Sequence, residues 1–179
     1  LPSRPRCHEP PPLCERALGV VGRLSAHGDE LEPLILPDPS VLDGFDAVAI
    51  VLLHGGRHPV HELALEAWVR QVRPHLFVAT GHRISPERGY LPRLETTLVH
   101  AAITPVLAGA LQRDRIPPSA RAIRSDGSLV APDALIAPDA VLSGPAGGVL
   151  AVRAVARAAG FERAIGLDIG GTSADICRV

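Results

Sequence analysis

The sequence predicts an α/β domain built on a mixed, mainly parallel sheet with flanking helices. An apolar, β-branched run at residues 45–54 is followed by a helical pattern at 58–73 and a second strand pattern at 75–82. Later, a helical pattern at 149–160 precedes a strand, a glycine-rich turn and a returning strand at 161–179. No segment repeats at a fixed period, so a repeat architecture is not indicated.

The composition is that of a globular protein without a strong charge preference. The chain has 179 residues, of which 46% are hydrophobic and 3% aromatic, and its net charge is −1. This balance gives no electrostatic reason to expect nucleic acid or a membrane as a partner. All 18 cations are arginine, which excludes a P-loop or Schiff-base lysine. The 3 unevenly spaced cysteines and the lack of an 18-residue apolar run favour a cytoplasmic setting.

The first section, residues 1–44, is expected to form an extended lead-in and short strands. Residues 1–13 are rich in proline, which favours an extended chain. Residues 14–36 alternate short apolar pieces with glycine and aspartate, a pattern of one or two strands and a turn.

The second section, residues 45–160, is expected to form an α/β lobe. Its strand at 45–54 should be buried on both faces, and Pro59 suits the first turn of the helix that follows. Strand, helix and strand joined by short connections predict a parallel, right-handed crossover.

Polar residues within this crossover allow two interpretations. Histidines near the predicted strand ends could bind a metal, because ligand sites in α/β proteins lie at the carboxyl ends of strands. No H-E-x-x-H pattern occurs, so a helix-capping or surface role for the histidines of the helix start is favoured over ligation. The helix itself is expected to present a solvated face with weak ion pairs. The histidines are His54, His58, His61 and His82, and the charged helix residues are Glu62, Glu66 and Arg70.

Further elements complete the lobe. Residues 91–115 show a long helical pattern that Pro105 should kink or split. Residues 120–132 indicate a strand that turns at Asp126 and Gly127, and residues 149–160 show a helical pattern that should stop at Gly160.

The third section, residues 161–179, contains the most distinctive motif, GLDIGGTSAD at 166–175. A glycine pair after a strand allows positive φ angles and a nest of N–H groups that binds phosphate. Hydroxyl side chains would add donors, and an aspartate at the strand end could hold Mg²⁺. A simple hairpin with an aspartate cap would have the same pattern.

The motif resembles a known superfamily when it is combined with the helix before it. A small-residue helix, GPAGGVLAVRAVARAAG, followed by strand, DxGGT and strand is similar to the hinge region of the actin/hexokinase/heat-shock-chaperone ATPases, which have a ribonuclease H-like fold. SGPAGGV and DIGGTSAD more closely resemble the hydantoinase A/5-oxoprolinase family, which includes N-methylhydantoinase A and acetone carboxylase β-type proteins. The segments CERALGVVGRL, HPVHE and ISPERGYLPRLETTLVHAAITP are also similar to family segments.

The resemblance implies an ATP- and Mg²⁺-dependent hydrolase that opens a cyclic amide or imide ring of the hydantoin or 5-oxoproline type. Phosphorylation of the carbonyl oxygen would activate the ring for attack by water. The catalytic residues implied are Asp168 and Asp175, with Asp168 also as metal ligand. The implied nucleotide-binding residues are Gly144, Gly147, Gly170, Gly171, Thr172 and Ser173.

The resemblance also implies that the chain is a central section of a two-lobed protein. Its partners would be a small cyclic amide and the missing lobes of the same protein or a partner subunit, with a homo-oligomer as a further alternative. SDGS at 125–128 and His100 depart from the family pattern, which has S-N-G-G and Asn there. Two other functions remain open: a non-catalytic assembly module, or a small-molecule kinase of the same superfamily.

Overall fold

The computed structural model describes residues 14–85, 89–113, 117, 119–171 and 174–179. The chain divides into two compact units, Leu1–Val106 (unit 1) and Leu107–Val179 (unit 2). The lead-in expected at 1–13 lies outside the described residues. The section boundaries expected at residues 44 and 160 remain a prediction.

Unit 1 begins with an antiparallel hairpin of β1 (Val21–Leu24) and β2 (Glu30–Ile35). Its turn closes with a hydrogen bond from the Ser25 backbone N–H to the Asp29 carbonyl oxygen, at 2.8 Å. A short 3-10 helix, η1 (Pro39–Leu42), follows. Two strands and a turn within 14–36 therefore confirm the expectation for this segment.

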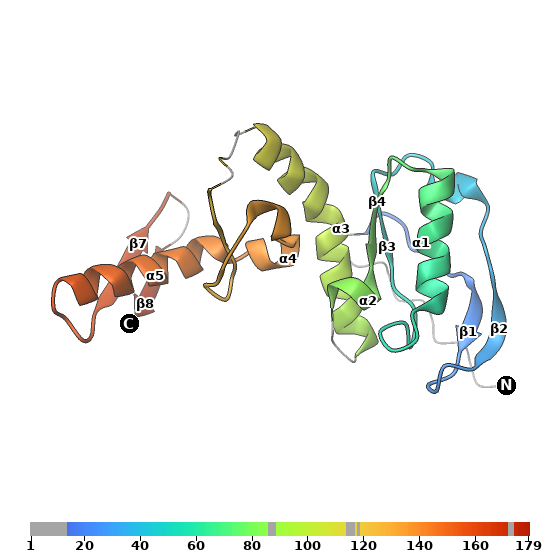
Figure 1. The fold of residues 1–179 in the computed structure, drawn as a ribbon, viewed down its shortest axis with the longest axis horizontal. Helices are drawn as coiled ribbons and strands as arrows, with labels where there is room; N and C mark the ends of the chain where they lie inside the picture. The colour runs from blue at the N-terminus through green and yellow to red at the C-terminus, as the bar shows by residue number, and fades with distance from the viewer. Residues whose placement is uncertain (1–13, 86–88, 114–116, 118, 172–173) are drawn as a thin grey trace. The chain divides into compact units, whose positions relative to one another are not determined.

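The centre of unit 1 is a parallel strand–helix–strand unit. Strands β3 (Ala47–Ile50) and β4 (Phe77–Thr80) pair in parallel, and α1 (Val60–Val72) connects them. Figure 1 shows α1 against one side of this pair and the first turns of α3 (Tyr90–Arg113) on the other. The parallel pairing predicted from the sequence is confirmed. The buried residues of the main core are Leu42, Ile50, Leu65, Val69 and Leu76.

Helix α3 follows the short helix α2 (Gly81–Ile84) and runs through Pro105 as one element. The sequence predicted a kink or a split at this proline. A proline removes one backbone hydrogen bond, but a helix of 24 residues keeps many others on both sides of it.

Unit 2 contains the end of α3 and, after it, a small hairpin of β5 (Ala122–Ile123) and β6 (Leu129–Val130). The predicted turn is present: the Asp126 carboxylate accepts a hydrogen bond from the Ser128 backbone N–H at 2.8 Å, and Gly127 has a φ of +82°. The hydrogen bonds from Ser128 lower the pKa of Asp126. Two short helices follow, η2 (Pro132–Ala134) and α4 (Ala137–Ala140).

The rest of unit 2 is helix α5 (Ser143–Ala158) and an antiparallel hairpin of β7 (Ile165–Ile169) and β8 (Ala174–Arg178). The helix begins at Ser143, before the periodic run at 149–160 that predicted it, so its first turns contain the glycines of SGPAGGV. Gly160, with a φ of +80°, follows the end of the helix as expected.

The sheets differ from the predicted, mainly parallel sheet. Within the described residues, the strands form four two-stranded sheets, of which β3–β4 is parallel and the other three are antiparallel. Short turns join the strands of each antiparallel pair, and a turn of that length permits only antiparallel pairing. No helix in the described ranges has the length and apolar character needed to cross a membrane.

Candidate functional site

The β7–β8 hairpin carries the two aspartates that the sequence selected as a phosphate and metal site. In its register, Asp168 stands directly opposite Asp175. Side chains of a strand alternate between its two faces, so Asp168 shares a face with Gly166, and Asp175 shares that face with Cys177. The geometry therefore brings the two predicted acids together on one side of the hairpin.

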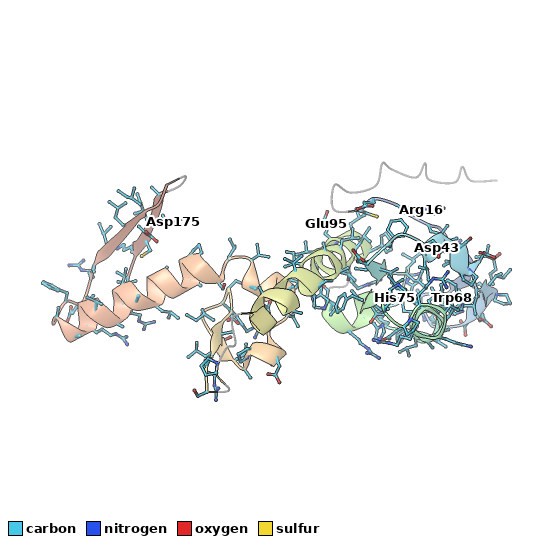
Figure 2. The ribbon with its side chains drawn as sticks, turned by 90° about the horizontal axis from the view of Figure 1, so that it is seen from above. Arg16, Asp43, Trp68, His75, Glu95 and Asp175 are labelled. Atoms are coloured by element: carbon cyan, nitrogen blue, oxygen red, sulfur yellow. The ribbon has the colours of Figure 1, made fainter. Side chains whose placement is uncertain are left out.

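The face with the aspartates is the one on which helix α5 packs. A Cβ atom at Gly166 would lie 2.5 Å from Val152 Cγ2 of the helix and 2.8 Å from Cys177 Sγ, so only glycine fits there. Figure 2 shows Asp175 on the hairpin, beside α5. The other face carries Leu167 and its partner Ile176, which are 60% and 74% exposed.

The two carboxylates have no cationic partner among the residues that the structure describes. Both residues are exposed. Opposed carboxylates repel each other unless a cation lies between or beside them, and carboxylate oxygens are the ligands that Mg²⁺ prefers. Asp168 and Asp175 thus fit a divalent cation. Thr172 and Ser173, predicted to add donors, lie outside the described residues.

The glycines of the turn differ from the expectation in one respect. In the described part of the chain, positive φ angles occur at several glycines and at His54, but not at Gly170 or Gly171. The prediction that this pair turns with positive φ was therefore wrong. Gly171 has no heavy atom within 4 Å of the position that its Cβ would occupy, so its backbone is open to a ligand.

The two glycines of the predicted hinge helix lie in the first turns of α5. Gly144 has open space where a Cβ would be, whereas a Cβ at Gly147 would lie 3.3 Å from Ile123 Cδ1. Gly147 therefore allows α5 to pack closely on β5. A role of either glycine toward a nucleotide remains part of the proposal below.

A buried polar network in unit 1 was not predicted as such. Glu62 and Glu66, expected on a solvated face, are 0% and 5% exposed. Glu62 Oε1 accepts a hydrogen bond from the Leu52 backbone N–H at 2.9 Å, and its Oε2 accepts one from His82 Nδ1 at 2.8 Å. Glu66 accepts from Arg70, as the spacing of four residues suggested. The solvated-face prediction was wrong for the two glutamates, because donors from the loop after β3 and from α2, invisible in the helix pattern, meet these carboxylates. It was right for Arg70, whose side chain is 58% exposed.

The histidines at the start of α1 hold the β1–β2 hairpin. His61 Nε2 is 2.9 Å from Glu30 Oε1, and His58 Nε2 is 3.3 Å from the Ala26 carbonyl oxygen. His61 is only 5% exposed, so a surface role for it was wrong. Across the described residues, no group of three or more His, Cys, Asp or Glu side chains could hold a metal ion.

Comparisons with known proteins agree with the motifs. The profile of the hydantoinase/oxoprolinase family matches residues 93–179. The caprolactamase subunit alpha of Pseudomonas jessenii is 34% identical over 88% of this chain, and 5-oxoprolinase 1 of Arabidopsis thaliana is 32% identical over 84% of it. The chain spans 25% and 12% of the length of these two relatives.

A solved structure gives the same result for the fold. The crystal structure of the ATP-dependent caprolactamase from Pseudomonas jessenii matches 99% of this chain and 29% of its own, with a TM-score of 0.72 and 27% identity. The match confirms the predicted α/β class and the actin-like ATPase fold. By motif, family profile and fold, the chain belongs to the hydantoinase/oxoprolinase family.

Proposed function

We propose that the protein containing this chain is an ATP-dependent hydrolase that opens a cyclic amide or imide ring. The observation that carries the proposal is the position of Asp168 opposite Asp175, near Gly171, whose Cβ position has open space around it. Support comes from two relatives whose names describe an ATP-dependent caprolactamase and a 5-oxoprolinase.

In this proposal, β7–β8 is a phosphate-binding hairpin. Asp168, with Asp175 beside it, would hold Mg²⁺, which when bound offsets the negative charge of the phosphate groups. The backbone N–H groups of Gly170 and Gly171 would donate to phosphate oxygens, and Thr172 and Ser173 would add hydroxyl donors. Gly144 and Gly147 would let the hinge helix approach the nucleotide.

ATP is needed because an amide resists attack by water. Phosphorylation of the carbonyl oxygen makes the ring carbon a better electrophile, and ring opening can then follow. This step, and the hydantoin- or 5-oxoproline-type substrate, are part of the proposal. The rest of the site would come from other parts of the same protein, a partner subunit or a second copy, in a cytoplasmic setting.

The test uses the whole protein, purified with any subunit that accompanies it. It is incubated with Mg-ATP and, in separate reactions, with caprolactam, 5-oxoproline or hydantoin. ADP and the ring-opened amino acid are both measured, and we expect them to appear together with at least one ring. Asp168→Asn should lower both by about 100-fold or more, since it removes an electrostatic contact to the reacting groups.

A matched control is Asp133→Asn, which changes an exposed carboxylate of the same unit. It should leave both products unchanged. A stable phosphorylated product with no ring opening would instead identify a small-molecule kinase. Absence of any ring-dependent ADP would favour the assembly module. Full activity of Asp168→Asn would contradict the role of the hairpin.

A further inference from the structure

A second polar site lies in unit 1, at the carboxyl ends of β3 and β4. Parallel strands end at the same edge of a sheet, and ligand sites in α/β proteins lie at that edge. The loop after β3 contains His54, whose φ of +66° is unusual for a residue other than glycine. Helix α2 begins directly after β4, and the first turn of α1 contributes Glu62. The three segments meet at this edge through Glu62, which accepts hydrogen bonds from the Leu52 N–H of the loop and from the His82 N–H of α2.

Glu62 fixes the orientation of the His82 imidazole. Its Oε2 accepts hydrogen bonds from the His82 backbone N–H at 2.9 Å and from His82 Nδ1 at 2.8 Å. A carboxylate only accepts, so Nδ1 carries a proton, and Nε2 is the acceptor of the ring in its neutral form. Gly55 is required here, because a Cβ at that position would overlap Glu62 Oε1.

The other ring nitrogen of His82 is available at the surface. The His82 side chain is 12% exposed. Within the described residues no hydrogen bond engages Nε2, and Nε2 is not among the buried atoms without a partner. The imidazole is therefore held by one nitrogen and presents the other, which is the arrangement that a general base requires.

Arg93 places a positive charge at the same edge. It is 3% exposed, and its Nη2 donates to the Leu52 carbonyl oxygen. Its Nε is the buried side-chain nitrogen that has no hydrogen-bond partner in the described residues. A Cβ at Gly56 would lie 3.0 Å from Arg93 Nη1, and a Cβ at Gly81 would lie 3.1 Å from Nε. Buried donors are nearly always paired, and the residues that the structure describes supply no acceptor for this one.

We propose that this edge is a ligand site at which His82 Nε2 transfers a proton. Glu62 is the positioning residue that holds the ring, and Arg93 is the donor for a carbonyl or carboxylate oxygen of the ligand. Within the described ranges, Arg83, which follows His82 in α2, pairs with Glu66 of α1 at 3.3 Å. The ligand is a small cyclic amide, a choice that rests on the proposed function.

The proton transfer balances within the ring-opening step. The oxygen of a water molecule bonds to the ring carbon that carries the phosphorylated oxygen, while His82 Nε2 accepts one proton of that water and then gives it to the ring nitrogen. As the carbon–nitrogen bond breaks, the second proton of the added water leaves for solvent; the products are a free amine and an acyl phosphate, and the imidazole ends as it began. A second water molecule then hydrolyses the acyl phosphate to the carboxylate and inorganic phosphate. A neutral imidazole held by a carboxylate is suited to this exchange.

The decisive variant is His82→Asn in the whole protein. The Asn amide can still donate to Glu62, which preserves the contact that holds α2, but it cannot take up a proton. We expect the kcat for ring opening to fall by about 100-fold with little change in KM. The limb of the pH–rate profile that reports deprotonation of the base should flatten. His75→Asn, which changes an exposed histidine of the same unit, should alter neither quantity.

Hydrogen exchange separates this role from a structural one and from the proposed function. Exchange in residues 77–85 should be the same in His82→Asn and wild type, which shows that the variant is folded. Millimolar caprolactam or 5-oxoproline, added without ATP, should slow exchange in residues 52–56 and 80–85 of the wild type. If the wild type shows this protection but no turnover, the proposed function and the proton transfer by His82 both fail, and the ligand site alone stands. Absence of protection, or a His82→Asn variant with a normal kcat and pH profile, would overturn the site.

Discussion

Asp168 of β7 and Asp175 of β8 are direct cross-strand partners in the antiparallel hairpin of unit 2. Residues opposite each other in such a pair have Cβ atoms about 4.5–5.5 Å apart. Two carboxylates at that separation repel, and no cationic side chain among the described residues compensates them. Under the proposed function, a divalent cation held by Asp168 and Asp175 would offset both charges.

The first prediction follows from this repulsion. In the absence of divalent cations, Asp175→Asn should stabilise the hairpin locally by about 0.2–1 kcal/mol, because it removes one of two opposed charges. In the presence of Mg-ATP the same variant should lose most of its ATP turnover. Hydrogen exchange of residues 165–178 with and without Mg²⁺ measures the first effect, and ADP release measures the second. A hairpin destabilised by Asp175→Asn in the absence of cations would contradict the repulsion.

A second prediction concerns the contact between the hairpin and α5. Gly166→Ala should destabilise the packing of the hairpin on α5 by about 1–3 kcal/mol, because there is no space between them for an added methyl group. The new Cβ would lie 2.5 Å from Val152 Cγ2. Gly148→Ala is the matched control: it lies in α5 with no heavy atom within 4 Å, so it should stabilise the helix by about 1 kcal/mol. Hydrogen exchange over residues 143–178 distinguishes the two, and equal effects would contradict the close packing.

The parts that sequence analysis predicted are those encoded by local pattern. The change from a strand pattern to a helical period and back at residues 45–82 predicts β3, α1 and β4, and the structure confirms them. Asp126 and Gly127 predict a turn through their own backbone chemistry. The family motifs selected Asp168 and Asp175, although only the register places them opposite each other.

What local pattern could not supply was the tertiary environment of polar side chains. A helix with Glu62, Glu66 and Arg70 has the same spacing whether its face is solvated or buried. The difference comes from the N–H groups of Leu52, in the loop after β3, and of His82, in α2, which both reach Glu62. The HGG stretch before the helix was a signal that could have revealed this network, because a side chain at position 55 would overlap the Glu62 carboxylate.

A third prediction tests that network. Glu62→Gln should destabilise the edge of β3–β4 by about 2 kcal/mol or more. The amide replaces one carboxylate oxygen by an NH2 group, which would face a buried N–H donor and leave that donor without an acceptor. Exchange should become faster in residues 51–56 and 80–85. Glu95→Gln, an exposed glutamate of α3 labelled in Figure 2, is the control and should change nothing. An unaltered exchange rate in Glu62→Gln would mean that the carboxylate is not needed to hold these loops.

The last prediction concerns His100, which stands where the family pattern has Asn. It is 8% exposed, its Nδ1 is 3.1 Å from Thr104 Oγ1, and its ring makes an edge contact with Phe77. Burial lowers the pKa of His100 below its ordinary value of 6.5.

The sign of the pH effect follows from that direction. Below a pH of about 6.5 the unfolded chain binds a proton at His100 that the folded chain resists, so the stability of unit 1 should fall as the solution is acidified through this range. The asparagine of His100→Asn keeps a polar group near Thr104 and does not titrate, so the variant should lose less stability on acidification than the wild type. Hydrogen exchange of residues 77–80 and 98–104, measured at neutral and mildly acidic pH, gives the comparison. His75→Asn, at an exposed position, should leave the acid sensitivity as it is in the wild type. If His100→Asn is as acid-sensitive as the wild type, another group causes the loss and the burial of His100 does not set the pH dependence of unit 1.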